Sequence, residues 1–240
     1  MNNSILYVTL FCLCMSLMGT MIGALIGVSV KNPSEKLLGL TLSFAAGLML
    51  IISIFELIPE AIEENGITNF FMFSLIGIFI ILIINYFSAS HDNNTHIKMA
   101  FLVALGIMLH NFPEGLVMGF GFMTKGNLGF KMSILIAIHD IPEGIVVAAP
   151  LNYSKVNKVK ILVYTLLTAL PAFFGALIAI YIGRISPVTI GASLSVAAGI
   201  MLYVVLVEML PESKKLCGIQ ICTLGMILGS IFGGLMIKFM

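Results

Sequence analysis

Long apolar runs separated by short polar segments dominate this sequence. An α-helix that crosses a bilayer needs about 20 apolar residues, and eight stretches meet that length. They cover residues 5–30, 37–58, 67–88, 98–122, 128–150, 159–183, 188–210 and 217–239. None shows the two-residue alternation of barrel strands, which excludes a β-barrel. The pattern therefore predicts an all-α integral membrane protein with eight transmembrane helices, folded as one domain over residues 1–240.

Composition points to the same class. Hydrophobic residues make up 60% of the chain and charged residues 10%, with a mean hydropathy of +1.12. A soluble domain has about 25% charged residues. The first run opens with Asn2 and Asn3 and no small-residue cleavage site follows it, which predicts a retained helix and not a signal peptide. A net charge of +1 gives no indication of a nucleic-acid partner. The high apolar content makes the lipid bilayer the expected environment.

Basic residues are unevenly distributed between the two sides of the predicted membrane. Eight of them follow the first, third, fifth and seventh runs: Lys31, Lys36, Lys98, Lys155, Lys158, Lys160, Lys214 and Lys215. The opposite side has four: Lys125, Lys131, Arg184 and Lys238. Because cytoplasmic loops are enriched in Lys and Arg, this asymmetry predicts that both termini lie outside.

The sequence contains a duplication. The segment "SFAAGLMLIISIFELIPEA" begins at Ser43, and the similar "SVAAGIMLYVVLVEMLPES" begins 152 residues later, at Ser195. The same offset aligns three runs at each end, so the predicted halves are about 1–88 and 153–240, with 98–150 inserted between them. An odd number of crossings separates equivalent runs, so the halves are inverted. Such 3+2+3 inverted repeats are typical of secondary transporters.

Two polar motifs interrupt the inserted runs: "HNFPEG" from His110 and "HDIPEG" from His139. Residues three and four apart share a helix face. The candidate metal ligands at these spacings are His110, Asn111, Glu114, His139, Asp140 and Glu143. If the two runs pack as antiparallel neighbours, all six side chains can converge in the middle of the membrane. Pro113 and Pro142 lack an N–H, which predicts a local widening of each helix beside the ligands.

The charges of the motifs favour a bound cation. A carboxylate at the centre of a membrane helix costs about 2.5–3.5 kcal/mol, and no Lys or Arg lies near Glu114, Asp140 or Glu143 within these runs. Imidazole combined with carboxylate suits Zn²⁺, Fe²⁺ or Mn²⁺ better than Ca²⁺ or Mg²⁺. The sequence therefore predicts a transition-metal site.

On these motifs the chain resembles the ZIP family of divalent metal transporters, over essentially its whole length. The resemblance implies a multi-pass protein of the plasma or inner membrane that imports zinc into the cytoplasm, with Fe²⁺, Mn²⁺, Co²⁺ and Cd²⁺ as further cargo and no resident cofactor. It implies that the six motif residues form the transport site. It also implies a homodimer whose transport bundle moves against a scaffold.

Several positions refine this resemblance. A glutamate that helps some relatives to hold a second ion is replaced by Ala172, so a second full site is not expected. Met49 matches a position where some relatives offer sulfur to the ion, although packing is the alternative role. His91, Asp92 and His96 form a short polar loop that either collects metal or is simply solvated. The acidic residues at the outer end of the second run predict either a solvated cap or a cation funnel: Glu56, Glu60, Glu63 and Glu64.

Two other function classes fit parts of the pattern. An intramembrane metal-dependent hydrolase also uses His and Glu on helices, but it needs an open metal position for water and a separate general base. A proton-coupled organic-ion carrier uses carboxylates as a relay, yet it does not explain two histidines facing two glutamates. The symmetric ligand set on a repeated chain favours a transporter over an enzyme.

Overall fold

A computed structural model describes residues 3–30, 34–88, 108, 111–123, 127–153, 155–182 and 187–239, and the regular structure within these ranges is helical throughout. The helices are α1 (Asn3–Ser29), α2 (Glu35–Ile52), α3 (Ile58–Asn65), α4 (Ile67–Ser88), α6 (Leu128–Tyr153), α7 (Lys158–Ile182), α8 (Pro187–Tyr203) and α9 (Leu210–Phe239). Residues 111–121 form a further helical segment. Among the described residues, five helical segments are long and apolar enough to cross a membrane, and Ile67–Ile83 is a shorter apolar helix.

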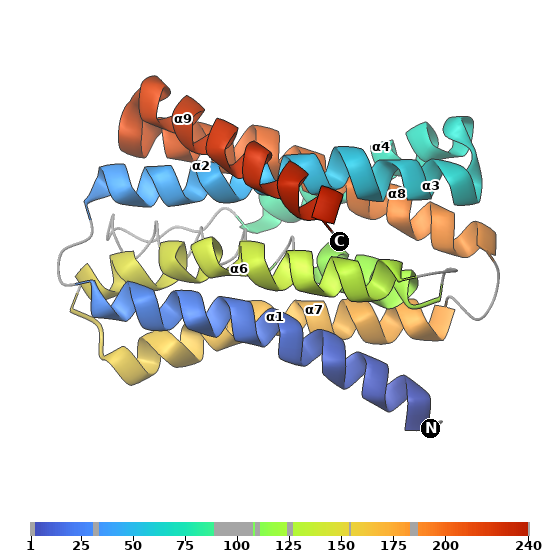
Figure 1. The fold of residues 1–240 in the computed structure, drawn as a ribbon, viewed down its shortest axis with the longest axis horizontal. Helices are drawn as coiled ribbons and strands as arrows, with labels where there is room; N and C mark the ends of the chain where they lie inside the picture. Colours follow the sequence, from blue (N-terminus) through green and yellow to red (C-terminus); the bar gives the residue numbers. More distant parts are fainter. Residues whose placement is uncertain are drawn as a thin grey trace.

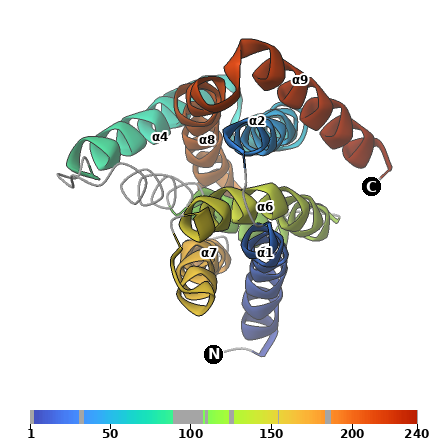
Figure 2. The same cartoon turned by 90° about the vertical axis from the view of Figure 1, so that its left-hand side faces the viewer.

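The helices lie in two groups, and most of them run roughly along a common long axis (Figure 1), whereas α4 and α9 spread outward from it (Figure 2). One group contains α2, α4, α8 and α9, in which α2 packs against α9 and α4 packs against α8. The other contains α1, α6 and α7, and Figure 2 shows these three on the opposite side of the molecule. The C-terminal ends of α1 and α6 and the N-terminal ends of α2 and α7 lie at one end of the bundle, whereas the start of α1 and the α3–α4 turn lie at the other (Figure 1).

Two π-helical turns widen the first group of helices. They are η1 (Ser53–Leu57), which joins α2 to α3, and η2 (Val204–Met209), which joins α8 to α9. Each lies just before a proline, Pro59 or Pro211, whose missing N–H removes a normal helical hydrogen bond. By contrast, α6 continues as an α-helix through Pro142, and 111–121 continues through Pro113. The predicted widening at Pro142 was therefore wrong, whereas residues 109 and 110, in the turn before Pro113, lie outside the described residues.

Helix boundaries in the described residues follow the sequence pattern with two notable differences. The second predicted run extends as helix through Asn65 and ends at Gly66, whose φ of +77° favours glycine. Gly218 has a φ of +76° and breaks the helical geometry inside α9. The eighth predicted run starts next to this break. The residues from Leu210 to Cys217, before the break, therefore continue the helix of the seventh predicted run.

Glycines 152 residues apart make corresponding contacts. A Cβ on Gly47 of α2 would meet the carbonyl of Met226, and a Cβ on Gly199 of α8 would meet the carbonyl of Ser74. Met226 and Ser74 are themselves 152 residues apart. The contact between α2 and α9 is thus repeated, with matching residues, between α8 and α4. These glycines let backbones approach closely where side chains would hold them apart.

The same correspondence extends to the helices that carry the two motifs. Gly23 of α1 lies against Ile141 and Gly144 of α6, and Gly175 of α7 lies against Phe112 and Gly115. Each contact falls directly beside a motif glutamate. The two outer helices, α1 and α7, therefore hold the two motif helices in the same way.

Candidate metal site

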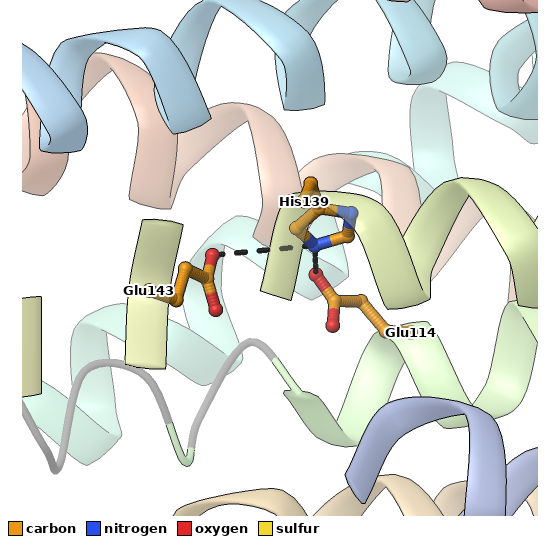
Figure 3. A group of neighbouring side chains, drawn as sticks. All are labelled: Glu114, His139 and Glu143. Atoms are coloured by element: carbon orange, nitrogen blue, oxygen red, sulfur yellow. Dashed lines mark hydrogen bonds and ion pairs between the residues drawn. The ribbon is translucent and has the colours of Figure 1, made fainter. Parts of the chain in front are cut away.

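Helix 111–121 and α6 bring three side chains of the two motifs together. Glu114 comes from the first helix, and His139 and Glu143, one turn apart, come from α6 (Figure 3). One ligand atom from each of the three lies within 4.8 Å of the others, and all three side chains are buried. His139 Nε2 lies 2.8 Å from Glu114 Oε1 and 4.0 Å from Glu143 Oε1. This spacing fits one metal ion bound between the two helices.

Asp140 adds a third carboxylate beside this group. Its Oδ1 lies 3.4 Å from His139 Nε2, and the side chain is buried. One imidazole thus faces three carboxylates in a water-poor interior. Such an arrangement is costly without a compensating positive charge, because the charged groups have lost their hydration. A divalent cation bound among these residues would provide that charge.

Several polar atoms of the site have no hydrogen-bond partner within the described part of the chain. These atoms are Asn111 Oδ1, Glu114 Oε2, His139 Nδ1 and Asp140 Oδ1. Buried polar atoms normally have a partner, because leaving one without a partner costs about 1–3 kcal/mol. Several buried polar atoms without partners around one histidine are expected where side chains bind a metal ion. The donor set of imidazole nitrogen and carboxylate or amide oxygen suits a transition metal.

The second residue of each motif is held by an outer helix. Asn111 Nδ2 donates to the backbone carbonyl of Thr168 in α7 at 2.7 Å. Asp140 Oδ2 accepts from Ser16 Oγ at 3.0 Å and lies 3.4 Å from Thr20 Oγ1, both in α1. The sequence analysis did not include α1 in the site. The available signal was the spacing of Thr9, Ser16 and Thr20, which puts hydroxyls on one side of an apolar helix.

The remaining predicted ligands have different positions. His110 lies outside the described residues, as do His91, Asp92 and His96. Met49 is fully buried in α2 within the apolar core, and its sulfur stays a predicted ligand. Ala172 is buried in α7, where its backbone contacts Gly115, next to Glu114.

The acidic residues of the second run lie apart from this group along the chain. Glu56 is half-buried in η1, and the other three lie in α3, where Glu63 is exposed. Their positions, within the wide turn for Glu56 and beyond it for the others, are compatible with either of the predicted roles, a solvated cap or a cation funnel.

Comparison with known proteins identifies the family. A family profile described as ZIP Zinc transporter matches residues 88–237. The zinc transporter ZupT of Salmonella arizonae is 32% identical over 89% of this chain and 94% of its own length. The ZupT of Escherichia coli O7:K1 is 36% identical over 82% and 83% of the two chains, and that of Enterobacter sp. strain 638 is 33% identical over 87% and 92%. Because these similarities extend far beyond the two motifs, the chain belongs to the ZIP zinc transporter family.

Proposed function

We propose that this protein carries divalent transition-metal ions, with zinc as the main cargo, across the cell membrane into the cytoplasm. This proposal rests mainly on the buried group of Glu114, His139 and Glu143. In that group Glu114 Oε2 and His139 Nδ1 have no hydrogen-bond partner among the described residues. The family is one of transporters, so the protein is not an enzyme and the hydrolase alternative is set aside. Fe²⁺, Mn²⁺, Co²⁺ and Cd²⁺ are the expected further cargo, because the same nitrogen and oxygen ligands accept them.

One principal metal position explains the ligand set best. His110, Glu114, His139 and Glu143 supply two nitrogens and two carboxylates from the i,i+4 pairs of the two motifs. Asn111 and Asp140 lie further round their helices and complete the site from one side, and Met49 is a candidate sulfur ligand. With neutral histidines the three motif carboxylates carry a charge of about −3, so one divalent ion leaves about −1. A second ion leaves an excess of positive charge that Ala172 does not offset.

The proposed membrane arrangement has eight spans, with two inverted halves of about 1–88 and 153–240 around the motif spans at 98–150. The matching contacts of Gly47 and Gly199, and of Gly23 and Gly175, support this arrangement. The distribution of Lys and Arg supports outside termini, and the resemblance to the family supports a homodimer. The midplane between such repeats is where transporters bind their cargo.

Metal-resolved uptake into liposomes that contain the purified protein tests the function. We expect accumulation of Zn²⁺ that an approximately hundredfold excess of Mg²⁺ or Ca²⁺ does not suppress, since those ions favour all-oxygen sites. A Glu114→Ala, Glu143→Ala double variant serves as the control for leakage. Equal competition by Mg²⁺ would contradict the proposed site, and uptake that matches empty liposomes would contradict the proposed function.

A further inference from the structure

Helix α1 carries none of the motif residues, yet its hydroxyl groups reach a buried carboxylate of the metal site. We propose that Ser16 is a positioning residue that sets metal selectivity: it holds Asp140 Oδ2, so that Oδ1 alone faces the cation. This inference rests on the proposed function, because it concerns how the same site chooses among divalent ions.

Of the two α1 hydroxyls near Asp140, Ser16 fits the positioning role better than Thr20. Ser16 Oγ donates to Asp140 Oδ2 at 3.0 Å, and both side chains are fully buried. Thr20 Oγ1 donates to the Ser16 carbonyl of its own helix at 2.9 Å and lies 3.4 Å from Asp140 Oδ2. Thr20 is therefore satisfied locally, as hydroxyls in helices often are. Ser16 makes the shorter contact with the carboxylate.

The other oxygen of Asp140 is directed toward the metal ligands. Asp140 Oδ1 lies 3.4 Å from His139 Nε2, the nitrogen that also contacts Glu114 at 2.8 Å. Within the described residues Oδ1 has no hydrogen-bond partner. The carboxylate is thus held at one oxygen by α1 and presents the other to the site.

The first motif, which contains Asn111, is held by an equivalent contact, and this repetition argues against a chance contact. Asn111 occupies the place of Asp140 in its motif, and Thr168 lies 152 residues after Ser16. The Thr168 carbonyl accepts from Asn111 Nδ2 at 2.7 Å, while Asn111 Oδ1 has no partner in the described structure. Each outer helix therefore holds one polar atom of the side chain, Asp140 Oδ2 or Asn111 Nδ2. The other atom, Oδ1 in both residues, has no hydrogen-bond partner among the described residues. Only α1 makes its contact through a side chain of the outer helix, so only that contact can be removed without changing a motif residue.

Holding one oxygen restricts how Asp140 binds an ion. A carboxylate that offers a single oxygen suits Zn²⁺, which prefers four ligands. A carboxylate that is free to turn can offer both oxygens, which suits larger cations that prefer oxygen, such as Mn²⁺. Loss of the Ser16 hydroxyl is therefore expected to lower the preference for Zn²⁺ over Mn²⁺. A hydrogen bond to a charged group contributes enough for a change of about three- to tenfold in that ratio.

The test is competitive uptake of Zn²⁺ and Mn²⁺ into liposomes by four variants. Ser16→Ala removes the hydroxyl, Ser16→Cys keeps most of the volume with a weaker donor, and Ser16→Thr retains the hydroxyl. Ser195→Ala is the matched control, since Ser195 is buried but bonds to the Gly191 carbonyl of its own helix. We expect a lower Zn²⁺ to Mn²⁺ ratio in the Ala and Cys variants, and a wild-type ratio in Ser16→Thr and Ser195→Ala.

The outcomes separate this inference from the proposed function. An unchanged ratio in Ser16→Ala, or in Ser16→Cys if the alanine variant does not fold, would overturn the role of Ser16. An equal shift in Ser195→Ala would also overturn it, because the effect would then come from any loss of a buried hydroxyl. Failure of the wild-type protein to take up either ion would instead contradict the proposed function.

Discussion

Gly23→Ala is expected to slow metal uptake strongly, because α1 and α6 touch through their backbones at this residue. A Cβ on Gly23 would lie 2.9 Å from Gly144 Cα and would overlap the Ile141 carbonyl oxygen. Carbon atoms in contact lie about 3.5–4.0 Å apart, and the overlap with the carbonyl oxygen is the larger of the two, so the helices must separate by about 1 Å. Neither obstacle is a side chain that can rotate away.

The separation has two consequences for the site. The bond of 3.0 Å from Ser16 to Asp140 lengthens beyond hydrogen-bonding distance, because it crosses the same helix interface. Glu143, which directly precedes Gly144, shifts relative to Glu114. A displacement of about 1 Å in a binding site reduces rates by about tenfold to a hundredfold. Overpacking of this kind also lowers the free energy of unfolding by about 1–3 kcal/mol.

Zinc uptake per folded molecule and thermal unfolding in detergent measure these two effects. Gly175→Ala, the position 152 residues later, is expected to behave like Gly23→Ala because it meets Gly115 and Phe112 in the same way. Gly234→Ala is the control, since a Cβ there meets nothing within 4 Å. Uptake and stability of Gly23→Ala equal to those of Gly234→Ala would refute the close helix contact and the reasoning built on it.

Three further outcomes are expected. Glu114→Ala or Glu143→Ala abolishes zinc uptake, whereas Asn111→Ala or Asp140→Ala leaves measurable uptake with altered selectivity. If Asp140→Ala loses as much uptake as Glu143→Ala, and the wild type binds two ions, the proposal of one principal site is contradicted. Ala172→Glu raises the metal bound per protein, measured by elemental analysis, toward one additional ion, and unchanged binding would argue against a role for residue 172. On a background without native cysteines, an impermeant thiol reagent labels Asn3→Cys but not Asn157→Cys in intact cells, and the reverse pattern would overturn the predicted topology.

Much of the fold could be predicted from the sequence because the runs have the length of a membrane span. The third run was predicted over 67–88 and α4 covers Ile67–Ser88, since Gly66 and the polar loop delimit it clearly. The end of the second run, predicted at residue 58, was harder to place. The helical segment continues through Glu60 and Glu63 in α3, because the charged residues there are partly exposed and do not end a helix by themselves. The turns before Pro59 and Pro211 were not foreseen, because proline tells which bond is lost but not how the helix adjusts.

Helix periodicity in the sequence predicted which candidate ligands share a face of one helix, and it predicted no more of the site than that. His139 and Glu143 share a face of α6, and the structure brings Glu114 to them from the neighbouring helix. Periodicity within one helix says nothing about which other helix faces Asp140. The hydroxyls of α1 were therefore missed, although Ser16 and Thr20 stand out as polar residues in an apolar run. Locating them required the close contact at Gly23, which is a property of the packed structure.

The two motifs are held in related ways, but the hydrogen bond runs in opposite directions: Asp140 accepts from its outer helix, whereas Asn111 donates to its outer helix. Asp140 needs a donor, and α1 supplies the Ser16 hydroxyl; Asn111 has an amide that donates, and α7 supplies the Thr168 carbonyl. An aspartate at position 111 would set a carboxylate against that carbonyl, with two acceptors facing each other in a buried site. The neutral amide is therefore matched to its surroundings, which limits the negative charge of the site. Three carboxylates and one amide agree with the proposal of one principal metal position, and the small side chain of Ala172 agrees with it as well.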